Sequence, residues 1–193
     1  EHKQGYIVWH SVGESFARLA GRLSRLLERE AYPGVGDWVT LKAIPKPGHT
    51  AVVDRVLTRR TVFTRGAAGA QGRQQVIAAN VDIVFIVTGL DANYNVRRIQ
   101  RYLARVGVSG AQPVVVLNKA DACDDVVGHI AEVEMAAPGA LVIATSAKLK
   151  CGLERFMDQL RPGITAAFVG SSGAGKSTLI NALLGEERLR TGE

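Results

Sequence analysis

The residues with the clearest chemistry lie near the C-terminal end of the sequence, in Gly170-Ser171-Ser172-Gly173-Ala174-Gly175-Lys176-Ser177. This segment matches G-x-x-x-x-G-K-[ST], the pattern of a phosphate-binding P-loop. The backbone N–H groups of such a loop can surround a phosphate chain, and the N-terminus of the following helix adds a favourable dipole. The glycines allow the backbone to approach the phosphates without a Cβ in the way.

Two side chains of the P-loop have expected roles of their own. Lys176 would reach the β- and γ-phosphates and is the candidate catalytic residue, and the Ser177 hydroxyl would ligate Mg²⁺. The apolar run from Ile164 to Val169 predicts a buried strand before the loop. Thr178 would complete the phosphate site at the start of a helix that runs to Leu184. This strand, loop and helix form the context that the motif requires.

A second candidate element, Asn118-Lys119-Ala120-Asp121, directly follows a predicted buried strand from Pro113 to Leu117. It reads N-K-x-D, a guanine-recognition element. The Asp121 carboxylate can accept hydrogen bonds from guanine N1–H and N2–H₂, whereas adenine would leave it unpaired, a mismatch that sites of this kind reject by a factor on the order of 10⁴. Asn118 would fix the loop and approach the base edge, and the Lys119 stem would cover the base plane.

The third candidate element, Ser146-Ala147-Lys148, follows a predicted strand from Leu141 to Ala144. It is similar to the S-A-K element of GTPases, whose backbone contacts guanine O6. The chain order is therefore N-K-x-D, S-A-K and then the P-loop, whereas the P-loop comes first in ordinary GTPases. We expect a circularly permuted GTPase, because the same strands and helices can pack in one sheet with the chain cut elsewhere.

The sequence pattern from Gln75 onward predicts an α/β fold. Continuous apolar strands, the first from Val81 to Thr88, alternate with amphipathic helices, which indicates a doubly wound parallel sheet. Asn95 is a candidate cap for a helix whose polar face is rich in arginine. Ligands of such sheets bind at the carboxyl ends of the strands, where all three candidate elements lie.

Residues 1–66 predict a small β-barrel resembling an OB-fold, because short strand patterns alternate with turn signals. The apolar spacing over residues 15–29 favours an amphipathic helix. A strand from Phe16 to Arg22 followed by a loop is the alternative, and the sequence leaves both open.

Residues 67–74, rich in glycine and alanine, are the predicted linker between the two domains, 1–66 and 75–193. The segment could serve only as a flexible connection. Alternatively, the neighbouring Arg59, Arg60 and Arg65 could contact RNA. The net charge of +6 is compatible with a nucleic-acid partner, but it is weak evidence alone, because solvated surface arginines also explain it. No apolar run is long enough to span a bilayer, and Cys123 and Cys151 have no metal-binding spacing, so we expect a cytoplasmic protein with no membrane partner.

Three segments carry a resemblance to a known family: Gly36-Asp37-Trp38-Val39, the run from Gln75 to Asp82, and the P-loop extended to Asn181. Together with the permuted order, they resemble the small-ribosomal-subunit biogenesis GTPase A family. The resemblance implies an N-terminal OB-fold that binds RNA, a permuted GTPase domain and a C-terminal zinc-binding domain. It also implies GTP hydrolysis that is stimulated by the small ribosomal subunit late in its maturation.

The same resemblance sets the expected cofactors and partners. These are GTP or GDP with Mg²⁺, the small ribosomal subunit and its 16S-type rRNA, and a monomeric protein. In the family, switch segments and then zinc ligands follow the P-loop, so we expect the 193 residues to be part of a longer protein, with Zn²⁺ only in its C-terminal domain. The alternatives are a P-loop ATPase or small-molecule kinase, and an RNA-binding module whose nucleotide site is regulatory and does not hydrolyse.

Overall fold

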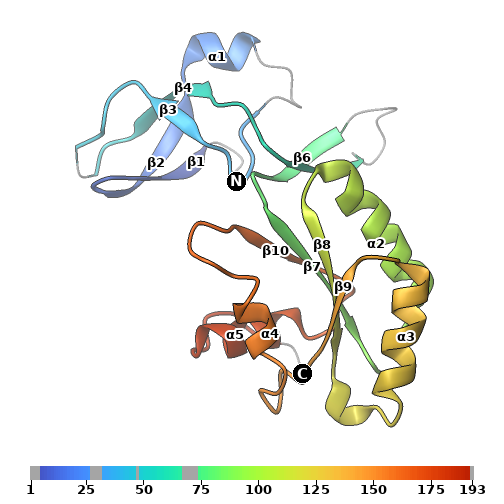
Figure 1. Ribbon diagram of the computed structural model, residues 1–193. Coiled ribbons are helices and arrows are strands. Elements are labelled where there is room, and N and C mark those ends of the chain that lie inside the picture. The colour runs from blue at the N-terminus through green and yellow to red at the C-terminus, as the bar shows by residue number, and fades with distance from the viewer. Residues whose placement is uncertain (1–4, 27–31, 47, 67–73, 192–193) are drawn as a thin grey trace. The chain divides into compact units, whose positions relative to one another are not determined.

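The computed structural model describes residues 5–26, 32–46, 48–66 and 74–191. The chain divides into two compact units, Glu1–Asn80 and Val81–Glu193 (Figure 1). No helix in the described ranges is both long and apolar enough to cross a membrane.

The second unit is built on four parallel strands: β7 (Ile83–Gly89), β8 (Gln112–Asn118), β9 (Leu141–Ala144) and β10 (Ala166–Val169). Their spatial order is β10-β7-β8-β9. Every residue of β7 is buried, as expected of a parallel strand that is covered on both faces. The chain passes through β7, β8 and β9 in spatial order and then returns to the other side of β7, where β10 pairs. This reversal creates a switch point beside β10, where ligands of such sheets bind.

Two layers of helices cover this sheet (Figure 1). On one face, α2 (Val96–Ser109) and α3 (Val126–Ala136) pack through a cluster that includes Ile99 and Val133. On the other face, α4 (Glu154–Met157) and α5 (Lys176–Leu184) contribute Phe156 and Leu179 to a second cluster. Residues of β8 alternate between the two clusters, which is the two-residue periodicity of a strand.

The predicted strands and helices of this unit are confirmed, with ends that shift by a few residues. The prediction that the strand before the P-loop is buried is wrong, because β10 lies at the edge of the described sheet and is half-buried. Asn95 caps α2 as expected, since its side chain accepts a hydrogen bond from the Arg98 N–H at 3.0 Å. Between β8 and α3 lies a short 3₁₀ helix, η2 (Ala120–Ala122).

The first unit contains a four-stranded sheet in the order β1-β2-β4-β3. The strands are β1 (Tyr6–His10), β2 (Gly13–Leu19), β3 (Val39–Leu41) and β4 (Ala51–Val56). β2 and β4 pair in parallel, and the other neighbours are antiparallel. The buried core of the sheet is small, consisting of Ala17, Ala51 and Val53 with partly buried neighbours.

The segment 15–29 contains both a strand and a helix. Residues 15–19 belong to β2, so the prediction of a helix over this part is wrong, because pairing with β1 and β4 overrides the helical spacing. The strand alternative is right as far as Leu19. A short helix, α1 (Gly21–Leu26), then replaces the expected loop, and residues 27–29 lie outside the described ranges.

The boundary between the two units differs from the predicted one. β5 (Val62–Gly66) and β6 (Gln74–Ala79) form an antiparallel pair, and Ala79 N–H also donates to the Val35 carbonyl at 2.9 Å. These backbone bonds keep β6 in the first unit, which ends at Asn80 rather than at residue 66. Residues 67–73 of the predicted linker lie outside the described ranges, and residue 74 begins β6.

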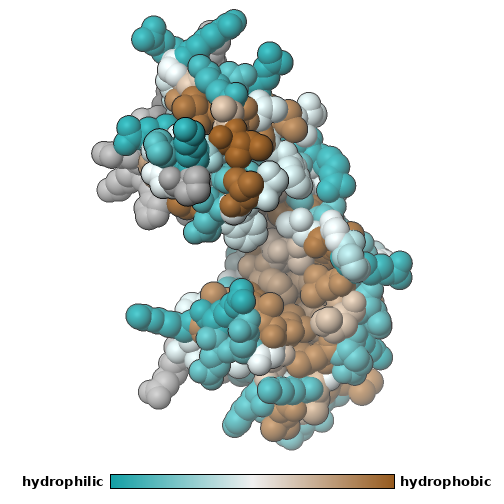
Figure 2. All heavy atoms as spheres, turned by 90° about the vertical axis from the view of Figure 1, so that its left-hand side faces the viewer, coloured by the Kyte–Doolittle hydropathy of each residue, from teal (hydrophilic) through white to brown (hydrophobic). Residues whose placement is uncertain are grey.

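Large apolar side chains are exposed on the first unit. Trp9 is 85% exposed and Trp38 68% exposed, and Ile7, two residues before Trp9 on the same face of β1, is also exposed. Figure 2 shows hydrophobic surface on this unit, in the upper part of the view. Such exposed aromatic residues indicate a binding surface more often than a single exposed leucine does.

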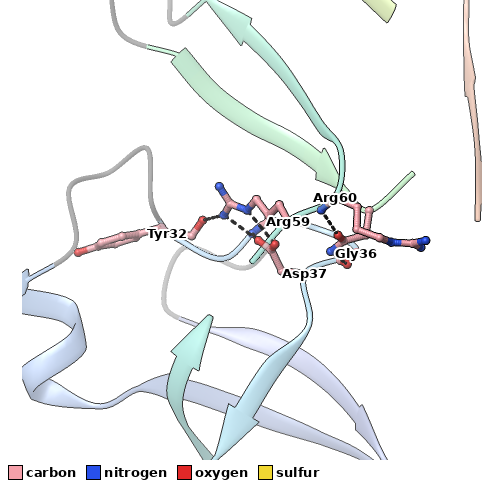
Figure 3. Close-up of polar contacts among 7 residues, drawn as sticks. Tyr32, Gly36, Asp37, Arg59 and Arg60 are labelled. Atoms are coloured by element: carbon pink, nitrogen blue, oxygen red, sulfur yellow. Dashed lines mark hydrogen bonds and ion pairs between the residues drawn. The ribbon is translucent and has the colours of Figure 1, made fainter. Parts of the chain in front are cut away.

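A buried ion pair fastens the turn that precedes β3 (Figure 3). The Asp37 side chain is 1% exposed and accepts two hydrogen bonds from Arg59, each at 2.8 Å, and one from Gly34 N–H at 2.7 Å. Arg59 also donates to the Tyr32 carbonyl at 2.9 Å. Contact with RNA is one of the two alternatives for Arg59, and in the structure its side chain is instead bonded to Asp37 and Tyr32.

Asn80 completes this arrangement from the end of the first unit. Its side-chain amide donates to the Gly36 carbonyl at 3.0 Å and accepts from Arg60 N–H at 2.9 Å. The residue is 5% exposed and has a left-handed φ of 55°, a conformation that asparagine tolerates better than most residues. Asn80 thereby joins the turn at Gly36 to the strand that begins after Arg60.

Candidate nucleotide site

One buried side chain joins the three predicted elements at the carboxyl edge of the second unit's sheet. Asn118, at the end of β8, is 2% exposed. Its Nδ2 donates to the Ala174 carbonyl of the P-loop at 2.9 Å, and its Oδ1 accepts from the Ala147 N–H at 3.1 Å. The N-K-x-D, S-A-K and P-loop segments therefore form one site, although they are far apart in sequence.

Backbone bonds align the two base-recognition loops. Ala120 N–H donates to the Thr145 carbonyl at 3.1 Å, and Thr145 N–H donates to the Leu117 carbonyl at 2.9 Å. The Ala147 N–H is occupied by Asn118, so in this structure it is not available to guanine O6. Lys148, the last residue of the S-A-K segment, is exposed.

The Asp121 carboxylate is oriented by a neighbouring hydroxyl group. The Ser146 hydroxyl donates to its Oδ1 at 2.6 Å, and the same hydroxyl accepts from Leu149 N–H at 3.0 Å. The bond from Ser146 lowers the pKa of Asp121 below its usual value, and the positive charges of Lys148 and Lys119 add to the effect. The carboxylate is therefore ionised at neutral pH and exposed, as an acceptor for two N–H groups must be.

Lys119 has a partner that the sequence reasoning missed. Its Nζ lies 2.6 Å from Oδ2 of Asp91, in the loop after β7. This hydrogen bond is the main reason that the pKa of Asp91 is lowered. The sequence offers one indication of this partner, which is the position of Asp91 directly after a buried strand whose carboxyl end lies at the same edge of the sheet.

At two positions of the P-loop only glycine fits, because a neighbouring polar group lies where a Cβ would be. Gly170 has a φ of 149°, and a Cβ there would overlap the Val87 carbonyl. Gly175 has a φ of 88°, and a Cβ there would overlap the Asn118 side-chain amide. Both positions combine a backbone conformation that favours glycine with a lack of space.

Lys176 and Ser177 begin helix α5. Lys176 Nζ donates to the carbonyls of Gly170 at 3.1 Å and Ser171 at 2.7 Å, so the ammonium group lies across the loop. Ser177 and Thr178 are half-buried in the first turn, at the positive end of the helix dipole. A serine hydroxyl fits Mg²⁺, which prefers hard oxygen ligands and keeps waters and phosphate oxygens in its shell. The described part of the chain contains no cluster of three or more His, Cys, Asp or Glu suited to a metal.

Beside the P-loop, α2 presents a basic surface. A pocket of about 330 Å³ is lined by Arg98, Arg101, Tyr102, Arg105 and Ser171. Helix α2 carries no acidic residue, and none of its arginines forms an ion pair within the described ranges. The surface therefore has uncompensated positive charge.

Comparison with known sequences finds one family. The sequence profile described as RsgA GTPase matches residues 56–193. A protein of Opitutus terrae named small ribosomal subunit biogenesis GTPase RsgA is 48% identical over 200 residues, covering 100% of this chain and 54% of the relative. A protein of the same name from Methanosarcina acetivorans is 46% identical over 177 residues, covering 92% of this chain and 47% of the relative. The chain spans about half the length of these curated relatives.

Solved structures have the same fold. The crystal structure of YjeQ from Thermotoga maritima matches with a TM-score of 0.72 at 25% identity, covering 94% of this chain and 62% of that one. YloQ, described as a circularly permuted GTPase, matches with a TM-score of 0.67 at 22% identity, covering 94% of this chain and 61% of its own. The fold of the chain is thus that of a circularly permuted P-loop GTPase.

Proposed function

Because the chain belongs to the RsgA GTPase family, we propose that it binds GTP and GDP and forms part of an enzyme that hydrolyses GTP during late maturation of the small ribosomal subunit. The observation that carries the proposal is the Asn118 side chain, which holds both base-recognition loops against the P-loop. A site assembled in this way can bind the base and the phosphates of one nucleotide together.

Asp121 would select guanine. Its carboxylate is ionised, exposed and oriented by Ser146, and it offers two lone-pair directions to guanine N1–H and N2–H₂. Titration of labelled GTP and ATP tests this choice. Tighter ATP binding would contradict the proposal and favour a P-loop ATPase or a small-molecule kinase.

Lys176 and the loop amides would stabilise the charge that develops on the transferring phosphoryl group. Lys176 already lies across the loop, where its two carbonyl partners can be exchanged for phosphate oxygens. Ser177 would hold Mg²⁺, which supplies charge neutralisation on the phosphates. Zinc binding remains a proposal for the longer protein.

We propose that the first unit is an OB-fold that binds RNA. Its order β1-β2-β4-β3, with one parallel pair and α1 between β2 and β3, corresponds to four of the five strands of an OB-fold. The exposed Trp9 and Trp38 could stack on unpaired bases. These features support 16S-type rRNA as the partner of this unit.

The arginines of α2 would contact backbone phosphates of the same RNA. Arg101 and Arg105 are exposed and line the pocket beside Ser171. Replacing both by Gln should reduce the slope of log affinity against log salt for the small subunit by about 1 to 2. The matched control is Arg155→Gln with Arg161→Gln, two exposed arginines elsewhere in this unit. An equal reduction in the control would contradict a contact at α2.

The decisive experiment measures GTP hydrolysis by the complete protein with and without purified small ribosomal subunits. We expect the subunits to stimulate turnover. RNA binding without turnover and without dependence on the nucleotide would favour a regulatory site that does not hydrolyse. A cytoplasmic location and a monomeric state accompany this proposal, and sedimentation of the protein tests the latter.

A further inference from the structure

Asp91 and Lys119 form an ion pair between two neighbouring loops of the nucleotide site. Lys119 Nζ and Asp91 Oδ2 are 2.6 Å apart, and the side chains are 36% and 26% exposed, respectively. The backbones of the two loops are also joined, because Leu90 N–H donates to the Asn118 carbonyl at 2.8 Å. The pair thus links the end of β7 to the guanine-recognition loop.

Asp91 is itself firmly held. Its Oδ1 accepts from Asn93 N–H at 2.9 Å, and its carbonyl accepts from Tyr94 N–H at 2.8 Å. The carboxylate folds back over Gly89, where an added Cβ would lie only 3.1 Å from Oδ1. A residue fixed in this way, on the short connection to a capped helix, can orient a flexible partner.

Lys119 needs such a partner. A free lysine stem has many rotamers, and ordering it when a ligand binds opposes binding. Here the backbone fixes one end of the stem in a left-handed conformation with a φ of 63°, and Asp91 fixes the other end. The stem is therefore ordered before any nucleotide arrives.

We propose that Asp91 is a positioning residue of the guanine site, which holds the Lys119 stem in place as the apolar platform for the face of the base. This inference rests on the proposed function. The lowered pKa of Asp91 agrees with it, since the pair stays ionised at neutral pH.

A double-mutant cycle on GDP affinity, measured by calorimetry, tests the proposal. Asp91→Asn removes the charge that holds the ammonium group and should weaken GDP binding about fivefold. Lys119→Met removes the charge and should weaken it about tenfold. The double variant should bind as weakly as Lys119→Met alone, because the aspartate acts only through the lysine.

Two control variants show whether a loss of GDP affinity comes from the lost charge of Asp91 or from a general disturbance of the fold. Asp124→Asn makes the same chemical change at an exposed residue that forms no hydrogen bond or ion pair within the described ranges, and GDP affinity should not change. Asp91→Glu keeps the carboxylate and should stay within about twofold of the original affinity.

Three results would overturn the proposal. The first is that Asp91→Asn weakens GDP binding by the same factor in the original protein and in the Lys119→Met variant. The second is that Asp91→Asn leaves GDP binding unchanged or makes it tighter. The third is that Asp91→Glu loses as much GDP affinity as Asp91→Asn. Failure of the unmodified protein to bind GDP would instead count against the proposed function, so the two failures are distinguishable.

Discussion

In the second unit four parallel strands bury a nearly continuous apolar core, whereas the buried cluster of the first unit's four-stranded sheet consists of Ala17, Ala51 and Val53, and the unit also contains the Asp37–Arg59 charged pair. In the second unit the buried polar side chains of Asn118, Thr145 and Ser146 lie at one edge of the sheet, in the proposed nucleotide site. The first unit uses Asp37 and Asn80 to hold a turn and a strand end. Buried polar groups thus lie in the proposed site in one unit and hold a turn and a strand end in the other.

This difference affects how each unit should respond to substitution. A buried ion pair that loses one member leaves an uncompensated charge, which costs about 3 to 5 kcal/mol. The first unit should therefore be the more sensitive to single polar changes, and the nucleotide site should tolerate loss of the first unit's pair.

The largest expected effect concerns the site and not the fold. Lys176→Ala should reduce GTP hydrolysis on the order of 10³-fold, because a charge that stabilises the transferring phosphoryl is lost. Thermal unfolding without nucleotide should change little, since within the described ranges the Lys176 ammonium group donates to two loop carbonyls, those of Gly170 and Ser171. Normal turnover by this variant in the complete protein would show that the P-loop assignment is wrong.

Asp37→Asn tests the first unit, whose turn depends on a buried ion pair. It should lower the free energy of unfolding of the first unit by about 3 kcal/mol, because Arg59 keeps a buried charge without its partner. GDP affinity should stay the same. Asp54→Asn, at a carboxylate that is 43% exposed, is the matched control and should change stability by no more than about 0.5 kcal/mol. Loss of GDP affinity in Asp37→Asn would show that the two units are energetically coupled.

Asn118→Ala should affect fold and site together. It leaves the Ala174 carbonyl and the Ala147 N–H without their partner, at a cost of about 2 kcal/mol in unfolding free energy. Guanine nucleotide affinity should fall as well, because the P-loop and the base loops lose their connection. Chemical denaturation and GDP calorimetry measure the two effects, and a variant with lost stability but full affinity would contradict the role of Asn118 in assembling the site.

The smallest expected effect is on acid titration. The pKa of Asp121 lies below its ordinary value of 3.8, so its ionised form stabilises the fold fully above that value and the contribution is lost as the pH falls through the lowered pKa. Ser146→Ala removes the donor and should raise the pKa of Asp121 towards its ordinary value, so that the pH-dependent contribution of this carboxylate becomes smaller. Carboxyl NMR measures the shift, and Asp91, whose pKa depends on Lys119, is the internal reference.

The sequence predicted the second unit well because its signals are local and agree with one another. Runs such as Val84 to Val87 are apolar because both faces of the strand are covered, and each motif directly follows a strand. The structure brings the three segments that were predicted to bind a nucleotide together at one edge of the sheet.

What the sequence did not predict depends on distant contacts. The Asp37–Arg59 pair joins residues 22 positions apart, and the Asp91–Lys119 pair joins residues 28 apart. No local pattern identifies such partners. In β2, pairing with two neighbours overrides a helical spacing, and in β6, backbone bonds to β5 extend the first unit beyond the expected boundary.

The strand order β10-β7-β8-β9 has a consequence for the order in which the site forms during translation. A growing chain can pair β7, β8 and β9 as they emerge, so both base-recognition loops exist before the phosphate loop has been made. β10 must then return to β7, where Ala166 lies beside Ile83, a residue synthesised much earlier. Asn118 meets the Ala174 carbonyl only at that point, so the proposed nucleotide site cannot be complete in the nascent chain until β10 is in place.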